Sequence, residues 1–155
     1  MTTLNVKEIF NDLHQMPELG MQEYKTSAYL ADAMEKLGYD VTRNVGGTGV
    51  VAIEKGEEEG PVLLLRADMD ALPYTIDGKQ VAIHACGHDA HTAVLLAVAR
   101  YLKAHENELK RRIRFIFQPA EESSVSGARM MLESGVLNGV SEVIAAHCDN
   151  SIPVG

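Results

Sequence analysis

The sequence has 155 residues, of which 46% are hydrophobic and 23% are charged, as is usual for a single globular domain. Its formal net charge of −8 opposes binding to nucleic acid or to an anionic membrane surface, and no basic run offsets that charge. No apolar stretch reaches the roughly 20 residues of a membrane-spanning helix, MTTLNVKEIF lacks a signal-peptide pattern, and two isolated cysteines favour a reducing, cytoplasmic location.

Two helices are expected first in the chain. Apolar residues recur at helical spacing in the first of them: Val6, Ile9, Phe10 and Leu13. Pro17 ends that segment. A second helix, with Leu30, Met34 and Leu37 on one face, is predicted to begin after Thr26 or Ser27 and to end at Gly38.

Two strands are predicted next, YDVTRNV and TGVVAIEKG. The GGTG beside them could suggest a phosphate-binding loop, but no helix start follows it, which favours a hairpin turn. GEEEG is expected to be a solvated, charged turn. This part of the chain therefore predicts a hairpin and no nucleotide site.

Strands and helices then alternate. PVLLLRADMD is predicted to be a strand buried on both faces, and RRIRFIFQ and SEVIAAHCD are two further strands. Helices are expected from about Asp89 to Leu109 and over SGARMMLESGVL, whereas YTIDGKQVAI is expected to be a loop. The longer helix carries an apolar stripe predicted to face the core: Val94, Val98, Tyr101 and Leu102. The alternation favours an α/β fold in which helices cover a mostly parallel sheet.

Polar side chains gather where these strands end or where a helix begins. They form four clusters: Asp68 with Asp70, Cys86 with His88, Glu121 with Glu122, and His147. Sites in open α/β sheets lie in the crevice outside the carboxyl ends of the strands. We therefore expect the four clusters to converge if the strands are parallel neighbours.

Thiolate, imidazole and carboxylate groups together are typical ligands of divalent metals. Cys86 and His88 are two residues apart, so in an extended segment their side chains point the same way. Glu121 and Glu122 are adjacent, and one metal rarely needs both. We predict that one ligates a metal while the other takes a proton from an activated water.

Each of these residues also has a structural interpretation. Asp89 could cap a helix, and His91 could cap or pack it. Cys148 is expected to be a small buried hydrophobe, His14 a structural residue and His105 an exposed helix residue. Two rival functions also stand: a thiol hydrolase with Cys86 as nucleophile, and a non-catalytic metal-binding or interaction module.

Five stretches resemble the N-terminal part of the M20 metallopeptidase clan, specifically its amidohydrolase branch of N-acyl-amino-acid amidohydrolases, hippurate hydrolases and auxin-conjugate hydrolases. These stretches are HQMPELGMQEYKT, RADMDALP, HACGHDAHTA, FQPAEE and HCDNSIPVG. The resemblance implies a zinc-peptidase-like catalytic domain that holds two divalent metal ions. Carried over to this sequence, the ligands are Cys86, His88, Glu122 and His147, and the catalytic base is Glu121.

The resemblance also implies a metal-dependent amidohydrolase that cleaves N-acyl amino acids or small peptides. Zinc or manganese suits the ligand set best, and nickel is a further candidate. Two divalent cations would leave the site net positive beside these anionic ligands, which favours a substrate carboxylate. Asp68, Asp70 and His91 have no assigned role.

Members of this clan are considerably longer than 155 residues. Residues 1–155 are therefore expected to be the N-terminal part of a catalytic domain, with the lid that makes the homo-oligomer, the last strands and one histidine ligand lying on a continuation. On that expectation the isolated chain is a poor enzyme.

Overall fold

The structure is a computed structural model that describes residues 5–53, 60–149 and 151–153. Its elements in chain order are α1 (Val6–His14), α2 (Tyr24–Leu37), β1 (Asp40–Val45), β2 (Gly49–Ile53), β3 (Val62–Asp68), β4 (Leu72–Ile76), β5 (Lys79–Ile83), α3 (His88–Ala104), a 3-10 turn η1 (Glu106–Glu108), β6 (Arg112–Gln118), α4 (Gly127–Glu133) and β7 (Val140–Ala145). The prediction for GEEEG falls largely on 54–59, outside the described residues. No helix in the described ranges is long and apolar enough to cross a membrane.

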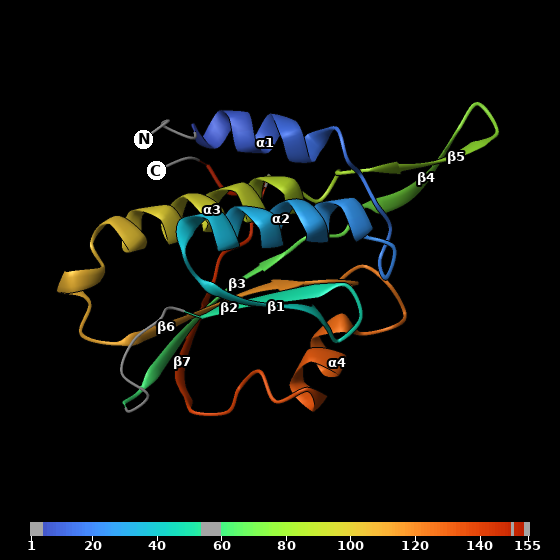
Figure 1. Ribbon diagram of the computed structural model, residues 1–155. Helices are drawn as coiled ribbons and strands as arrows, with labels where there is room; N and C mark the ends of the chain where they lie inside the picture. The colour runs from blue at the N-terminus through green and yellow to red at the C-terminus, as the bar shows by residue number, and fades with distance from the viewer. Residues whose placement is uncertain (1–4, 54–59, 150, 154–155) are drawn as a thin grey trace.

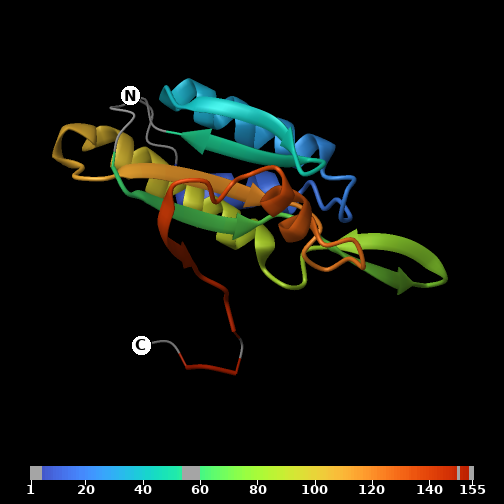
Figure 2. The same cartoon turned by 90° about the horizontal axis from the view of Figure 1, so that it is seen from below.

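Five strands form one sheet in the order β1-β2-β6-β3-β7, and Figure 2 shows them side by side in that order. β3 runs parallel to both β6 and β7, while β2 runs antiparallel to β1 and β6. The predicted α/β layer fold is confirmed, and so is the hairpin between β1 and β2. The parallel part of the sheet comprises β6, β3 and β7, at whose ends three of the four polar clusters lie, whereas Cys86 and His88 follow β5.

Helices cover both faces of the sheet, with α1, α2 and α3 on one side and α4 on the other (Figure 1). The larger core lies under the three helices and contains fully buried side chains from α2, α3 and β6: Leu30, Met34, Leu96, Phe115 and Phe117. A smaller core under α4 joins Leu64 and Ile116 to Met131. β3 and β6 supply side chains to both cores and are therefore held from both faces of the sheet. Each large apolar side chain contributes about 1.5–3 kcal/mol to stability when it is buried.

Two helix predictions are wrong in detail. The second helix begins at Tyr24 and not after Thr26, because the Glu18 carboxylate accepts the N–H groups of Lys25 and Thr26 and so caps the helix from outside. In α3, Val94 and Tyr101 are 52% and 62% exposed, while Leu95, Leu96 and Ala99 are buried. This helix is apolar around most of its surface, so spacing alone does not select the buried face. It also ends at Ala104, five residues before the predicted Leu109.

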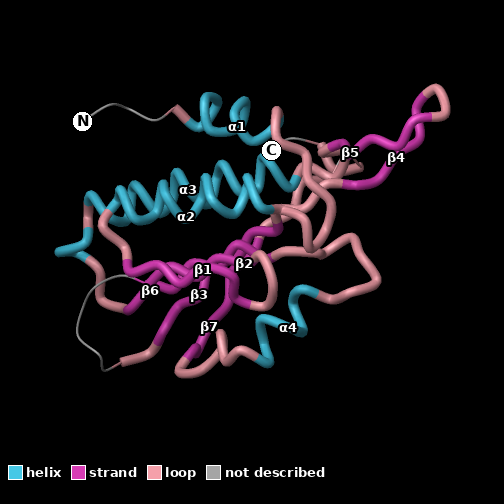
Figure 3. The backbone as a smooth tube through the Cα atoms, turned by 45° about the vertical axis from the view of Figure 1, so that its right-hand side comes forward, coloured by secondary structure: helices cyan, strands magenta, loops and turns pink. Residues whose placement is uncertain are grey.

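The segment predicted to be a loop, YTIDGKQVAI, is a β-hairpin instead. β4 and β5 pair antiparallel from Leu72↔Ile83 to Ile76↔Lys79, with Asp77 and Gly78 in the turn. Asp-Gly between strands is a strong hairpin signal, so the sequence did contain the information. Figure 3 shows that this hairpin projects away from the helices and the five-stranded sheet.

Candidate metal centre

The parallel strands bring their polar clusters to one edge of the sheet. Asp68 at the end of β3 is in register with Gln118 at the end of β6, and Arg66 is in register with Ala145 at the end of β7. The segments that follow these strands therefore emerge together, and the N-terminus of α3 reaches the same place. The predicted convergence of the four clusters is confirmed by this topology.

The sequence-predicted site residues lie close together. Ligand atoms of Cys86, His88 and Glu122 all lie within 4.8 Å of one another, as three potential metal ligands would. The Sγ atom of Cys86 is 3.5 Å from Nε2 of His147. Nε2 of His88 is 3.9 Å from the Glu121 carboxylate and 3.7 Å from that of Glu122. The structure thus gathers all five residues in one place.

His88 reaches the site by a different backbone path from the one predicted. It is the first residue of α3, and Gly87 before it has a left-handed conformation with φ +83°. Cys86 and His88 therefore do not lie on one extended segment. The left-handed turn at Gly87 brings both side chains to the site, and glycine adopts this conformation at little cost.

The His88 ring is the most unusual group in the site. Its side chain is 0% exposed, and neither ring nitrogen has a hydrogen-bond partner among the described residues. Carboxylate oxygens of Asp70 and Asp68 lie 3.4 and 3.7 Å from its two nitrogens, in addition to those of Glu121 and Glu122. Burial alone would lower the pKa of His88, but the carboxylates of Asp70, Asp68 and Glu122 hold it above its ordinary value.

A buried polar group without a partner is costly and calls for an explanation. A divalent cation bound among Cys86, His88 and Glu122 would supply a partner for the imidazole and neutralise the surrounding carboxylates. Thiolate, imidazole and carboxylate are also the donor types that such a cation selects. The residues present fit a metal ion.

The surroundings of Cys86 disfavour the thiol-hydrolase alternative. Burial, followed by the nearby carboxylates of Glu122, Glu121 and Asp68, raises the pKa of the Cys86 thiol to about 12. A nucleophilic cysteine needs a setting that lowers its thiol pKa. An acidic cluster suits a thiolate only when a cation is bound beside it.

His91 also lies in the site, in a second group of ligand-type residues: Asp68, His88, His91 and His147. Its two ring nitrogens already have partners. Nδ1 donates to Oδ1 of Asp68 at 2.7 Å, and Nε2 accepts the backbone N–H of Cys148 at 2.9 Å. Because an imidazole with both nitrogens engaged has no lone pair left for a metal, His91 holds the backbone next to His147 against β3.

Asp68 and Asp70 form the buried floor of the site. Asp68 accepts hydrogen bonds from Arg66 at 2.7 Å and from His91. Asp70 accepts the backbone N–H groups of Glu121 and Glu122 at 3.0 and 2.9 Å. Burial would raise the pKa of Asp70, but His88 and the two N–H groups hold it below its ordinary value. The sequence shows these carboxylates but no role for them, because their hydrogen-bond partners other than Arg66 lie 23 or more positions away in the chain.

Three further residues near the site have positions that bear on their predicted structural roles. Asp89 is not the N-cap of α3 but lies in its first turn, where it is buried and bonded to Nδ1 of His14 at 2.6 Å. His14 is therefore structural, as predicted. Cys148 is exposed and not buried, because the chain after β7 runs along the surface beside His91.

Comparisons with known proteins agree with this site. The model of Peptidase family M20/M25/M40 matches residues 64–155. The N-acetyl-L-cysteine deacetylase of Bacillus subtilis is 43% identical over 92% of this chain and 36% of its own length. The IAA-amino acid hydrolase ILR1-like 5 of Arabidopsis thaliana is 40% identical over 92% of this chain and 34% of its own length.

Solved structures share the fold. The crystal structure of the Bacillus subtilis protein YXEP, described as a dinuclear metal binding peptidase from the M20 family, has a TM-score of 0.85 and 41% identity to this chain. The match covers 96% of this chain and 44% of that one. The chain therefore spans less than half the length of the relatives that it matches.

Proposed function

Because the chain belongs to peptidase family M20/M25/M40, we propose that it carries the metal centre of a hydrolase that cleaves the amide bond of N-acyl amino acids or small peptides. The observation that carries the proposal is the buried His88 ring, which has no hydrogen-bond partner among the described residues and whose ligand atom lies within 4.8 Å of those of Cys86 and Glu122. Two relatives support the substrate class by name, since one deacetylates N-acetyl-L-cysteine and one hydrolyses IAA-amino acids.

In this proposal Cys86, His88, Glu122 and His147 hold two divalent metal ions, zinc or manganese first and nickel next. A neighbour described as dinuclear supports the number of ions. Bound ions would polarise the scissile carbonyl and make a water molecule more acidic. A further histidine ligand, a lid that forms the homo-oligomer and the last strands of the domain would come from outside residues 1–155. The chain by itself would then be a poor enzyme.

Glu121 is the proposed base, and Glu122 the proposed ligand. The Glu121 side chain is 41% exposed and that of Glu122 is 24% exposed, so Glu121 faces the solvent from which water and substrate arrive. Its carboxylate takes a proton from water as the water oxygen bonds to the carbonyl carbon. The C–N bond then breaks, and Glu121 passes the proton to the departing amine nitrogen.

The ions of the loaded site would attract an anionic group of the substrate directly. Two divalent cations bring four positive charges, of which Cys86, Glu122 and Glu121 neutralise three. The buried carboxylates of Asp68 and Asp70 add two negative charges behind them, so a substrate carboxylate would be drawn to the exposed side of the ions and not to a net positive site. The same proposal places the protein in the cytoplasm, because a ligating thiolate must stay reduced.

The test is elemental analysis of the purified full-length protein, in which residues 1–155 are joined to the proposed continuation, together with a panel of N-acyl amino acids, assayed with and without a chelator. We expect two divalent ions per chain and hydrolysis that is lost on chelation and restored by zinc or manganese. Activity that survives complete metal removal would instead support a Cys86 thiol hydrolase. Metal binding without turnover of any substrate in the panel would support a binding module.

A further inference from the structure

Glu23 is a fully buried carboxylate that lies outside the proposed ligand set. Its side chain is 0% exposed, directly before the first residue of α2. Oε1 accepts the backbone N–H of Ala120 at 2.8 Å, and Oε2 accepts the hydroxyl of Thr48 at 2.5 Å. A carboxylate is expensive to bury, so two specific hydrogen bonds far apart in sequence indicate a dedicated contact.

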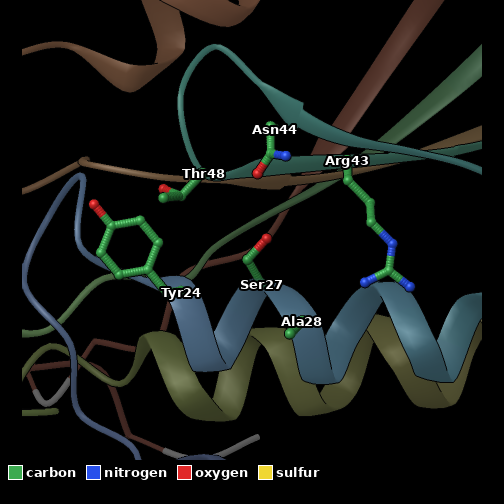
Figure 4. A pocket seen from close by; sticks show the side chains of 6 residues that line it. All are labelled: Tyr24, Ser27, Ala28, Arg43, Asn44 and Thr48. Atoms are coloured by element: carbon green, nitrogen blue, oxygen red, sulfur yellow. The ribbon is translucent and has the colours of Figure 1, made fainter.

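Thr48 comes from the turn between β1 and β2, above the first turn of α2. Figure 4 shows Thr48 in the wall of a pocket together with Tyr24 and Ser27 of α2. Thr48 is itself buried. The hydroxyl therefore fixes one oxygen of Glu23 from the sheet side and leaves the other for the Ala120 N–H.

Ala120 has an unfavourable backbone conformation immediately before the glutamate pair. Its φ is +50°, in the left-handed region that non-glycine residues rarely adopt. Such conformations persist only where several contacts with the surrounding structure hold them in place. Two hydrogen bonds hold it here, since Glu23 accepts its N–H and its carbonyl accepts the N–H of Gly127 at 3.2 Å. Gly20 also lies so close that a Cβ added there would be only 3.0 Å from the Cα of Ala120.

Buried carboxylates thus accept three successive N–H groups of this loop. Glu23 binds the N–H of Ala120, and Asp70 binds those of Glu121 and Glu122. The left-handed turn at Ala120 redirects the chain after β6 so that the next two N–H groups point at Asp70. Without the first contact, the turn would relax towards an ordinary conformation and displace both glutamates.

We propose that Glu23 is a positioning residue, which fixes the base Glu121 and the ligand Glu122 through the backbone of Ala120. This inference rests on the proposed function for the roles of the two glutamates. The part that acts is the acceptor oxygen and not the negative charge, since the partner is a neutral N–H group. Glutamine in place of Glu23 keeps such an oxygen, whereas methionine of similar length has none.

The experiment compares Glu23→Met and Glu23→Gln in the full-length protein. Displacement of a reacting group by about 1 Å can cost on the order of 100-fold in rate, so we expect kcat per metal-loaded site to fall about 10- to 100-fold in Glu23→Met. KM should change by less than about threefold, and Glu23→Gln should restore most of kcat. A variant that was merely less stable would lose folded protein while keeping kcat per loaded site.

A second readout does not depend on turnover. Co²⁺ is added to the metal-free protein, and its binding affinity and visible absorption bands report the geometry of the ligands, Glu122 among them. Glu23→Met should bind Co²⁺ about 10-fold more weakly, which is within the range for loss of a group that orients a ligand. Its absorption bands should also change. Glu23→Gln should match the wild type in both affinity and spectrum. Glu35→Met, an exposed change on the same helix, is the control and should change neither readout.

Thr48→Val provides a milder variant if Glu23→Met does not fold. It removes the hydroxyl that orients Glu23 and should shift both readouts in the same direction by a smaller amount. Wild-type kcat and Co²⁺ spectra in Glu23→Met would overturn the inference, and so would equal losses in Glu23→Met and Glu23→Gln. A wild-type chain that hydrolyses nothing would refute the proposed function, whereas the Co²⁺ comparison would still test the positioning role.

Discussion

The β4–β5 hairpin and the segment that follows it are neighbours in the chain but are held by different forces. The hairpin is stabilised by its own cross-strand pairs and by a local hydrogen bond from Gln80 to Thr75 at 2.7 Å. In the following segment His88, Asp89 and Thr92 are buried, and Thr92 donates to the backbone carbonyl of Asp68, 24 residues away, at 2.8 Å. Local sequence therefore dictates the hairpin, whereas the candidate metal centre depends on contacts between distant segments.

The largest expected effect separates the two glutamates of the site. Glu121→Gln should keep its metal ions and lose about 10²- to 10⁴-fold in kcat, the usual cost of losing a general base. Glu122→Gln should instead lose metal, because an amide is a poorer ligand than a carboxylate. The measurement is kcat together with metal content per chain, with the exposed Glu133→Gln as a control. If metal is lost from Glu121→Gln and retained in Glu122→Gln, the two roles must be exchanged.

Cys86→Ser tests the proposed metal ligand that lies beside His147. Serine is a weak metal ligand at neutral pH, so metal content and turnover should fall together. The affinity loss should exceed the roughly 10- to 100-fold typical of an outer-shell partner. Cys148→Ser is the matched control, since that thiol is exposed and belongs to no proposed ligand set. Unchanged metal occupancy and activity in Cys86→Ser would remove Cys86 from the site.

Gly87→Ala should disturb the site through a steric clash as well as through backbone strain. The residue has φ +83°, and a Cβ built there would overlap the Sγ atom of Cys148. Either α3 or the chain after β7 must shift, which separates Cys86 from His88 or from His147. We expect metal affinity to fall about 10- to 100-fold, as for other changes that misorient ligands. Titration with Co²⁺ measures this loss, and wild-type affinity would mean that the segment adapts without moving the ligands.

Asp68 links the site to the acid stability of the fold. Burial would raise its pKa, but the hydrogen bond from His91 and the charges of His88 and Arg66 hold the pKa below the ordinary value of 3.8. A lowered pKa stabilises the folded state above pH 3.8, and this stabilisation is lost as the pH falls through the lower folded-state value. Asp68→Asn should therefore destabilise the metal-free protein at neutral pH, by about 3 kcal/mol for a buried pair that loses one partner.

Between pH 4 and pH 2, the free energy of unfolding of Asp68→Asn should fall by less than that of the wild type. Urea unfolding of metal-free protein across this range measures the difference. Asp32→Asn breaks the exposed ion pair with Arg43 and should cost less than about 1 kcal/mol at any pH. An equally steep acid response in Asp68→Asn and wild type would show that other carboxylates govern acid unfolding.

The comparison of the two regions also explains what could be predicted from the sequence. The convergence of the polar clusters was predictable, because the carboxyl ends of parallel strands meet at one edge of a sheet. The clusters themselves are recognised by their residue types, which are typical metal ligands. The hairpin was predictable from Asp77-Gly78 but was missed. The contacts of Glu23 with Ala120 and of Asp70 with the glutamate loop join residues 97 and at least 51 positions apart. No local pattern reveals such pairs, so the groups that orient the site required the structure.

Gly78→Ala is expected to have the smallest effect. Gly78 has φ +74°, close to that of Gly87, yet no described atom lies within 4 Å of a Cβ built there. The substitution therefore costs backbone strain alone, about 1–2 kcal/mol for a left-handed alanine, and this cost falls on a hairpin that projects from the fold. Hydrogen exchange of the β4 and β5 amides should accelerate, while β3 amides, metal affinity and kcat stay at wild-type values. A loss of metal affinity as large as that of Gly87→Ala would show that the hairpin and the site are coupled, and that strain at either glycine reaches the ligands.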